Sequence, residues 1–189
     1  MKFLTYKAGD ALKVGALDDA KGVCDLVKAA KTLLGKDLPD TLRGVVEGLI
    51  QRGVPVDGVG HQMHINIEWP ALEEIRKSIR TFSAMRLDNQ VTELDVSVYT
   101  DSTSTAPVSQ EQLITQGYRY RDLFALFRKL KHSISSVTVW GLSDDTSWLK
   151  TFPITRDDKP LLFDEELQAK YSYWGVVDPS KLPAACAAP

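Results

Sequence analysis

Short alternating runs open the chain, and apolar residues of helical period follow them. Residues 2–6 and 12–16 are β-prone and flank Ala-Gly-Asp, which predicts a hairpin. Apolar residues then recur at three- and four-residue spacing from Val23 to Leu34, just before a glycine, and predict an amphipathic helix. A second amphipathic helix is expected over 40–53, with Asp40 as its N-cap and Gly53 at its end.

From residue 54 the pattern changes to strands that alternate with helices. This alternation, with short turns, is typical of right-handed βαβ units and a parallel sheet. The predicted fold class is therefore α/β, with helices flanking parallel strands, after a small N-terminal hairpin and helix. The strands are expected over Val54–Ile67, Gln90–Val98 and Ser136–Trp140, and the helices from Pro70 to Phe82 and, behind a capping box of Ser109 and Gln112, to about Lys131.

Each of these three strands carries its unusual residues near its C-terminal end. Gln62 and His64 end the first strand, Glu93 and Asp95 lie toward the end of the second, and Trp140 ends the third. Ligands of open α/β sheets and barrels bind at the edge formed by the carboxyl ends of the strands. The sequence therefore predicts a functional site at this edge.

Taken singly, each candidate has an ordinary structural interpretation. A glutamate in a strand is more often a salt-bridge partner than a nucleophile, and a histidine near a strand end is more often structural. Trp140 and Trp148 fit core or rim packing equally well. The combination at one sheet edge is much less common than any of its members, which favours the functional interpretation.

Composition and charge narrow the classes of function. The chain has 189 residues with a formal charge of −2 and no block of like charges, which argues against nucleic acid as a partner. No run approaches the roughly 18 apolar residues of a membrane span, and Met1–Asp10 lacks the apolar core of an export signal, so we expect no membrane partner. Cys24, in the first predicted helix, and Cys186, in the tail, are expected to be free thiols, and no metal or cofactor motif is found.

Three strings of residues carry a resemblance to a known family. They are Pro55–His64, Thr92-Glu93-Leu94-Asp95 and Val137–Leu149. In this order and spacing they closely resemble the second half of family 10 glycoside hydrolases, xylanases with a (β/α)8 TIM barrel. The resemblance implies a partial (β/α)8 barrel, about half, over residues 43–183, preceded by a leader of residues 1–42 and followed by a tail of residues 184–189.

The resemblance also implies a reaction and roles for single residues. Glu93 matches the catalytic nucleophile, His64 the histidine that hydrogen-bonds it, and Asp95 the carboxylate that orients that histidine. The implied substrate is xylan or a xylooligosaccharide, whose β-1,4 bonds are hydrolysed with retention of configuration. The residues matching the sugar-binding cleft are Gln62, Trp140 and Trp148.

One family motif has no counterpart in residues 1–50. It is the Asn-Glu pair of the fourth strand, whose glutamate is the general acid/base. A retaining mechanism needs this second carboxyl group about 5–5.5 Å from the nucleophile. Glu68 and Glu111 are the carboxyl groups that could replace the missing general acid/base. The alternative to an active hydrolase is a non-catalytic carbohydrate-binding or vestigial half barrel.

Two further expectations concern the leader and the assembly. Three short strings faintly resemble the N-terminal segment of fumarylacetoacetate hydrolase-type proteins, without that family's metal-binding catalytic domain. They are Met1–Tyr6, Val14–Asp19 and Leu38–Leu42. An open parallel sheet is expected to expose an apolar inner face and unpaired edges. A homodimer that completes or covers the half barrel is therefore predicted.

Overall fold

The chain forms two compact units, Met1–Asp57 and Gly58–Pro189. The computed structural model describes residues 2–8, 11–18, 22–25, 31–33, 37, 39 and 41–184. Among these residues no helix has the length and apolar character needed to cross a bilayer.

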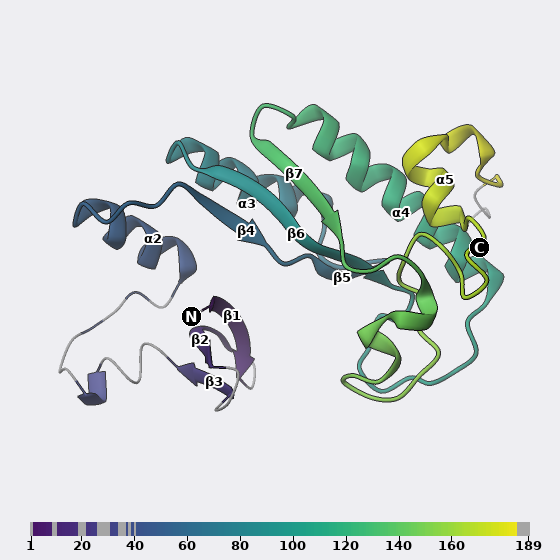
Figure 1. Cartoon of the computed structure of the whole chain (residues 1–189), viewed down its shortest axis with the longest axis horizontal. Coiled ribbons are helices and arrows are strands. Elements are labelled where there is room, and N and C mark those ends of the chain that lie inside the picture. The colour runs from purple at the N-terminus through teal and green to yellow at the C-terminus, as the bar shows by residue number, and fades with distance from the viewer. Residues whose placement is uncertain are drawn as a thin grey trace. The chain divides into compact units, whose positions relative to one another are not determined.

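Three antiparallel strands begin the first unit (Figure 1). The predicted hairpin is confirmed by the pairing of β1 with β2, and its turn lies outside the described residues. The helix predicted from Val23 is wrong at its start, because Gly22–Asp25 pairs with the free edge of β2 and places Cys24 in a strand. The spacing of apolar residues within one segment does not show that another strand has a free edge, so it could not predict this pairing. Cys186 lies outside the described residues. The strands are β1 (Lys2–Ala8), β2 (Ala11–Asp18) and β3 (Gly22–Asp25).

Helix α2 (Leu42–Gln51) follows in the first unit. Its N-cap is Thr41, whose hydroxyl oxygen accepts the Gly44 N–H at 3.1 Å, so the cap predicted at Asp40 is wrong. Asp40 itself lies outside the described residues. The helix ends before Gly53, whose φ of 73° is the left-handed conformation that glycine adopts most readily.

The second unit is the predicted parallel sheet with helical crossovers (Figure 1). Two short strands, β4 and β5, pair in succession with one side of β6, and β7 pairs with its other side, all in parallel. The single strand predicted over Val54–Ile67 is thus two strands, interrupted at Gln62 and Met63. The bounds are β4 (Gly58–His61), β5 (His64–Asn66), α3 (Leu72–Ala84), β6 (Asp88–Ser97), α4 (Gln110–Lys129), β7 (Ile134–Val139) and α5 (Tyr171–Val177).

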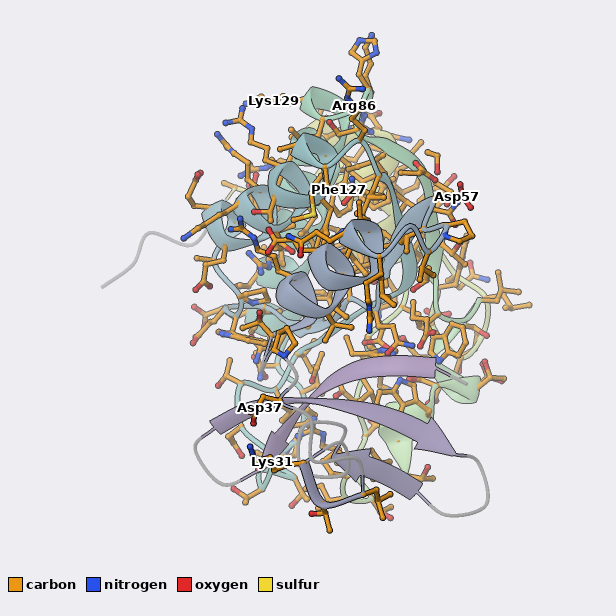
Figure 2. The ribbon with its side chains drawn as sticks, turned by 90° about the vertical axis from the view of Figure 1, so that its left-hand side faces the viewer. Lys31, Asp37, Asp57, Arg86, Phe127 and Lys129 are labelled. Atoms are coloured by element: carbon orange, nitrogen blue, oxygen red, sulfur yellow. The ribbon has the colours of Figure 1, made fainter. Side chains whose placement is uncertain are left out.

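Helices α3 and α4 supply the apolar face that packs against the sheet. The predicted capping box is confirmed, since Ser109 and Gln112 each accept the other's backbone N–H. In Figure 2 Phe127 lies among the packed side chains, whereas Arg86 and Lys129 lie at the rim. The core is formed by Met63, Ile65, Ile75, Ile79, Val91, Leu94, Val96, Tyr120, Leu123, Leu126, Phe127 and Leu130.

The opposite face of the sheet differs from the expectation. Gly60, Gln90 and Ser136 are register neighbours on β4, β6 and β7, and all three are exposed. The prediction of an apolar inner face is therefore wrong along this row, because small and polar residues occupy it. Among the residues that the structure describes, the outer edges of β4 and β7 pair with no other strand.

Candidate active site

Neighbouring strands bring the two predicted carboxylates to one histidine. In the parallel pairing of β5 with β6, His64 lies opposite Asp95. The ladder between β6 and β7 shifts register between Val91 and Leu94, and Glu93 lies within this irregularity. Such a bulge changes the direction of a side chain. The Glu93 side chain stays 16% exposed, while that of Asp95 is completely buried.

His64 bridges the carboxylates of Glu93 and Asp95. Its Nε2 lies 3.1 Å from Oε2 of Glu93, and its Nδ1 lies 2.9 Å from Oδ2 of Asp95. The predicted hydrogen-bonded chain from Glu93 through His64 to Asp95 is confirmed. Because the Asp95 side chain is completely buried, Glu93 is the one of the two carboxylates that can meet a ligand from solvent, next to a His64 side chain that is 27% exposed.

Gln62 fixes the second oxygen of Glu93. Its amide Nε2 donates to Oε1 of Glu93 at 2.8 Å, from the break between β4 and β5. Both carboxylate oxygens are therefore held by side chains on the neighbouring chain segment. A carboxylate held in this way loses little conformational freedom when it meets a ligand.

The two predicted tryptophans lie beside the histidine. The indole N–H of Trp148 donates to Oδ2 of Asp95 at 2.8 Å, and its ring centroid lies 4.9 Å from that of His64. The ring centroid of Trp140, the residue after β7, lies 6.3 Å from that of His64, and Trp140 is 44% exposed. The structure thus brings together all six residues that the sequence singled out.

The electrostatic environment favours a protonated His64. Burial lowers its pKa, but hydrogen bonds and charge from Asp95, and then from Glu93, outweigh burial and raise it above 6.5. The geometry agrees, because each ring nitrogen faces a carboxylate oxygen and both can donate only in the imidazolium form.

We expect His64 to titrate above pH 6.5 in NMR spectra of the folded protein, and its pKa to fall in both Glu93→Gln and Asp95→Asn. Because folding raises this pKa, the stabilisation by His64 is full below about pH 6.5 and is lost as the pH rises through the folded value. His61 is the internal control, since burial lowers its pKa although its Nε2 donates a hydrogen bond to Oδ1 of Asn89. Titration of His64 below His61 would contradict the bridging arrangement.

A buried ion pair anchors the loop that carries Trp148. Nζ of Lys170 lies 2.7 Å from Oδ2 of Asp144, with side chains 9% and 0% exposed. The ammonium group also donates to the carbonyls of Lys159 and Leu161, and Oδ1 of Asp144 accepts the Leu161 N–H. Burial raises the pKa of Asp144 and lowers that of Lys170. The pair therefore holds the segment after β7 against residues 159–170.

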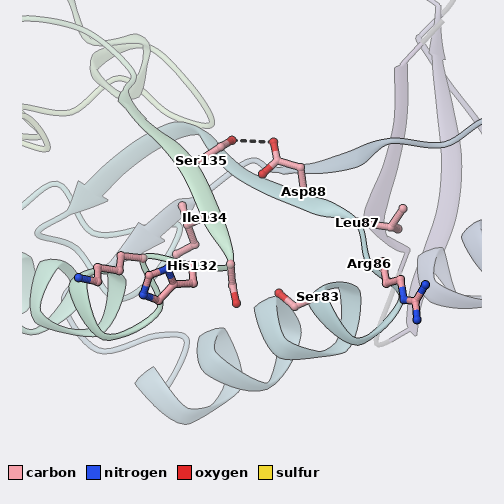
Figure 3. Close-up of a pocket in the computed structure, with 9 residues that line it drawn as sticks. Ser83, Arg86, Leu87, Asp88, His132, Ile134 and Ser135 are labelled. Atoms are coloured by element: carbon pink, nitrogen blue, oxygen red, sulfur yellow. Dashed lines mark hydrogen bonds between the residues drawn. The ribbon is translucent and has the colours of Figure 1, made fainter.

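A pocket of about 410 Å³ lies at the other end of the sheet, where β6 and β7 begin (Figure 3). Ser135 donates to Asp88 at 2.6 Å at its wall, and Arg86 and His132 point away from the space between them. It contains no residue of the candidate site. Its lining residues are Ser83, Arg86, Leu87, Asp88, Lys131, His132, Ser133, Ile134 and Ser135.

Sequence reasoning missed Phe152, whose ring stacks on Trp148 at 5.4 Å. The one hint in the sequence was its spacing of four residues from Trp148, which can bring two aromatic side chains together in a turn. In the part of the chain that the structure describes, no hydrogen bond or ion pair joins Glu68 or Glu111 to Glu93. The same residues hold no group of three His, Cys, Asp or Glu side chains suited to a metal ion.

Solved structures identify the architecture. The chain is similar to a family 10 glycoside hydrolase structure from Paenibacillus barcinonensis, with a TM-score of 0.72 and 44% identity over 76% of this chain and 42% of that one. Xylanase B from Clostridium stercorarium F9 matches with a TM-score of 0.70 and 38% identity over 81% and 50%. The fold and the site therefore define this protein, as a class, as a partial (β/α)8 barrel with a carboxylate-bearing site at its C-terminal strand edge.

The sequence comparisons give the family. Residues 36–179 match glycosyl hydrolase family 10. Endo-1,4-beta-xylanase C from Paenibacillus barcinonensis is 46% identical over 143 residues, which cover 74% of this chain and 13% of that protein. A thermostable celloxylanase from Thermoclostridium stercorarium is 43% identical over 146 residues, covering 76% and 38%. The chain belongs to glycosyl hydrolase family 10, and it spans well under half the length of these two relatives.

Proposed function

We propose that the chain carries the nucleophile side of an endo-1,4-β-xylanase, which hydrolyses the β-1,4 bonds of xylan with retention. The observation that carries the proposal is the Glu93 carboxylate, partly exposed and held through both oxygens by Gln62 and His64. The similarity to an intracellular xylanase of Thermoanaerobacterium saccharolyticum, solved as a mutant with xylotetraose, supports the substrate class (TM-score 0.62, 39% identity).

Glu93 acts in this proposal as the nucleophile. One oxygen of Glu93 attacks the anomeric carbon as the bond to the departing sugar oxygen breaks, and the departing oxygen takes a proton from a carboxylic acid outside the cluster of Gln62, His64 and Asp95. Water then attacks the same carbon, its proton passes to the carboxylate left by that acid, and the bond to Glu93 breaks, which restores the Glu93 carboxylate. His64 and Asp95 are positioning residues that keep the carboxylate oriented, while Gln62, Trp140 and Trp148 contact the sugar.

A second candidate function is non-catalytic carbohydrate binding. It is favoured by one observation, that the Asn-Glu dipeptide which carries the general acid in the family does not occur within the 189 residues. The tryptophans and Gln62 can still contact sugar in such a protein, because neither indole stacking nor amide hydrogen bonding needs the acid.

Digestion of xylan separates the two candidate functions. We expect the purified chain to release reducing ends from xylan above the level of a Glu93→Gln variant, with a β-configured first product. Release equal to that of the variant, together with calorimetric binding of xylotetraose, would replace the first candidate by the second. Neither release nor binding would contradict both.

The extent of the domains and the assembly are also proposals. We place the barrel part at residues 43–183, with residues 1–42 as a leader that faintly resembles the N-terminal segment of fumarylacetoacetate hydrolase-type proteins. A homodimer is expected to cover the free edges of β4 and β7. A concentration-independent mass of 21.0 kDa by light scattering would contradict the dimer.

A further inference from the structure

The Phe152 ring is exposed although it is large and apolar. It is 59% exposed, in the segment that follows β7. Its ring lies 5.4 Å from that of Trp148 at an interplanar angle of 23°, so the two rings are stacked. Phe152 therefore covers one face of the indole, and on that side the aromatic surface that meets solvent is the outer face of Phe152.

The support behind Phe152 is rigid. Trp148 is fixed by its hydrogen bond to Asp95, and the Trp148 carbonyl accepts the backbone N–H groups of Thr151 and Phe152, both at 3.1 Å. Beside this turn, Lys150 forms ion pairs with Asp157 and Glu165. An aromatic ring held in place before binding loses little conformational freedom when a ligand stacks on it.

The chemistry of this surface suits a sugar ring. Apolar sugar faces stack on flat aromatic rings, and an aromatic ring that is braced from behind and open in front offers that contact. A series of contacts links Phe152 to Glu93. Phe152 stacks on Trp148, Trp148 contacts His64, and His64 is hydrogen-bonded to Glu93. A xylan chain placed with one unit at Glu93 would bring a unit beyond its immediate neighbour toward Phe152, because two successive ring contacts, of 4.9 and 5.4 Å, separate Phe152 from His64.

We propose that Phe152 is a sugar-binding residue that stacks on a xylose unit outside the position formed by Glu93, His64 and the two tryptophans. The inference rests on the proposed function, because it takes the substrate class from it. It adds a further binding position that depends on substrate length. Phe152 contacts xylotetraose in this proposal, whereas a shorter oligosaccharide bound at Glu93 does not reach it.

Titrations with xylobiose and xylotetraose, followed by the NMR signals of the tryptophan indole N–H groups, test the proposal. Phe152→Ala is expected to weaken the binding of xylotetraose by about three- to tenfold and to leave that of xylobiose within about twofold. Phe152→Tyr keeps the ring and is expected to bind like the wild type. Val177→Ala, at a 58% exposed position at the end of α5, is the control matched for exposure.

The outcomes distinguish this inference from the proposed function. Unchanged binding of both oligosaccharides to Phe152→Ala would overturn the inference alone. Equal weakening of both would also overturn it, since it would show that Phe152 only supports Trp148. Absence of binding to the wild type would overturn the inference, while the proposed function is judged separately by the difference between wild type and Glu93→Gln on xylan.

Discussion

The Glu93→Gln variant is expected to release dinitrophenolate from a dinitrophenyl β-xylobioside on the order of 10³-fold or more slowly than the wild type. An acidic phenol departs without being protonated, so this substrate isolates the attack by the nucleophile from the step that needs a general acid. Glutamine has the shape of glutamate and can still accept the hydrogen bond from Gln62, but its neutral amide does not attack the anomeric carbon. Absorbance of the released phenolate gives the rate.

Two further variants make this expectation specific. Glu111→Gln, in the first turn of α4, changes a carboxyl group outside the hydrogen-bonded chain and is expected to keep the wild-type rate. Glu93→Ala opens space for a small anion, so added azide is expected to restore part of the rate and to yield a glycosyl azide. A wild-type rate in Glu93→Gln, or no azide product from Glu93→Ala, would refute the role of Glu93 as nucleophile.

The parallel sheet was predictable because its signals are local. The change from helical to strand period at residue 54, the capping box at Ser109 and the short turns each act within a few residues. Two elements were not predictable in this way. Gly22–Asp25 is a strand because β2 offers it a free edge, and the break at Gln62 and Met63 reflects the change of β6 register between β4 and β5.

The residues of the candidate site were about as predictable from the sequence as the parallel sheet. Glu93 and Asp95 are two apart on one strand, and parallel pairing of β5 with β6 places His64 opposite Asp95, so sequence spacing predicts that these residues lie close together. The register shift at Glu93 was not predictable from that spacing. Phe152 and the pair of Asp144 with Lys170 depend on how irregular segments fold back. Residues 144 and 170 are separated by a stretch without long helices or strands, and no periodic pattern predicts which side chains of such a stretch meet.

Lys170→Met is expected to destabilise the second unit by about 3–5 kcal/mol, because it leaves the Asp144 carboxylate buried without its cation. It also removes the donor to the Lys159 and Leu161 carbonyls. Urea unfolding followed by tryptophan fluorescence measures the change, since all four tryptophans of the chain lie beyond residue 58 and report on this unit. Glu73→Gln, which breaks an exposed pair with Arg76 on α3, is the control and is expected to cost less than about 1 kcal/mol.

The double variant Asp144→Asn with Lys170→Met separates buried charge from lost packing. An asparagine at 144 keeps an oxygen for the Leu161 N–H and carries no charge, so the double variant is expected to be more stable than Lys170→Met alone. Equal or lower stability of the double variant would show that the two side chains are not energetically coupled. The pair also anchors the loop that carries Trp148, whose indole N–H donates to Asp95. The NMR chemical shift of this N–H is therefore expected to change in Lys170→Met at urea concentrations well below unfolding. In the double variant it is expected to return toward the wild-type value.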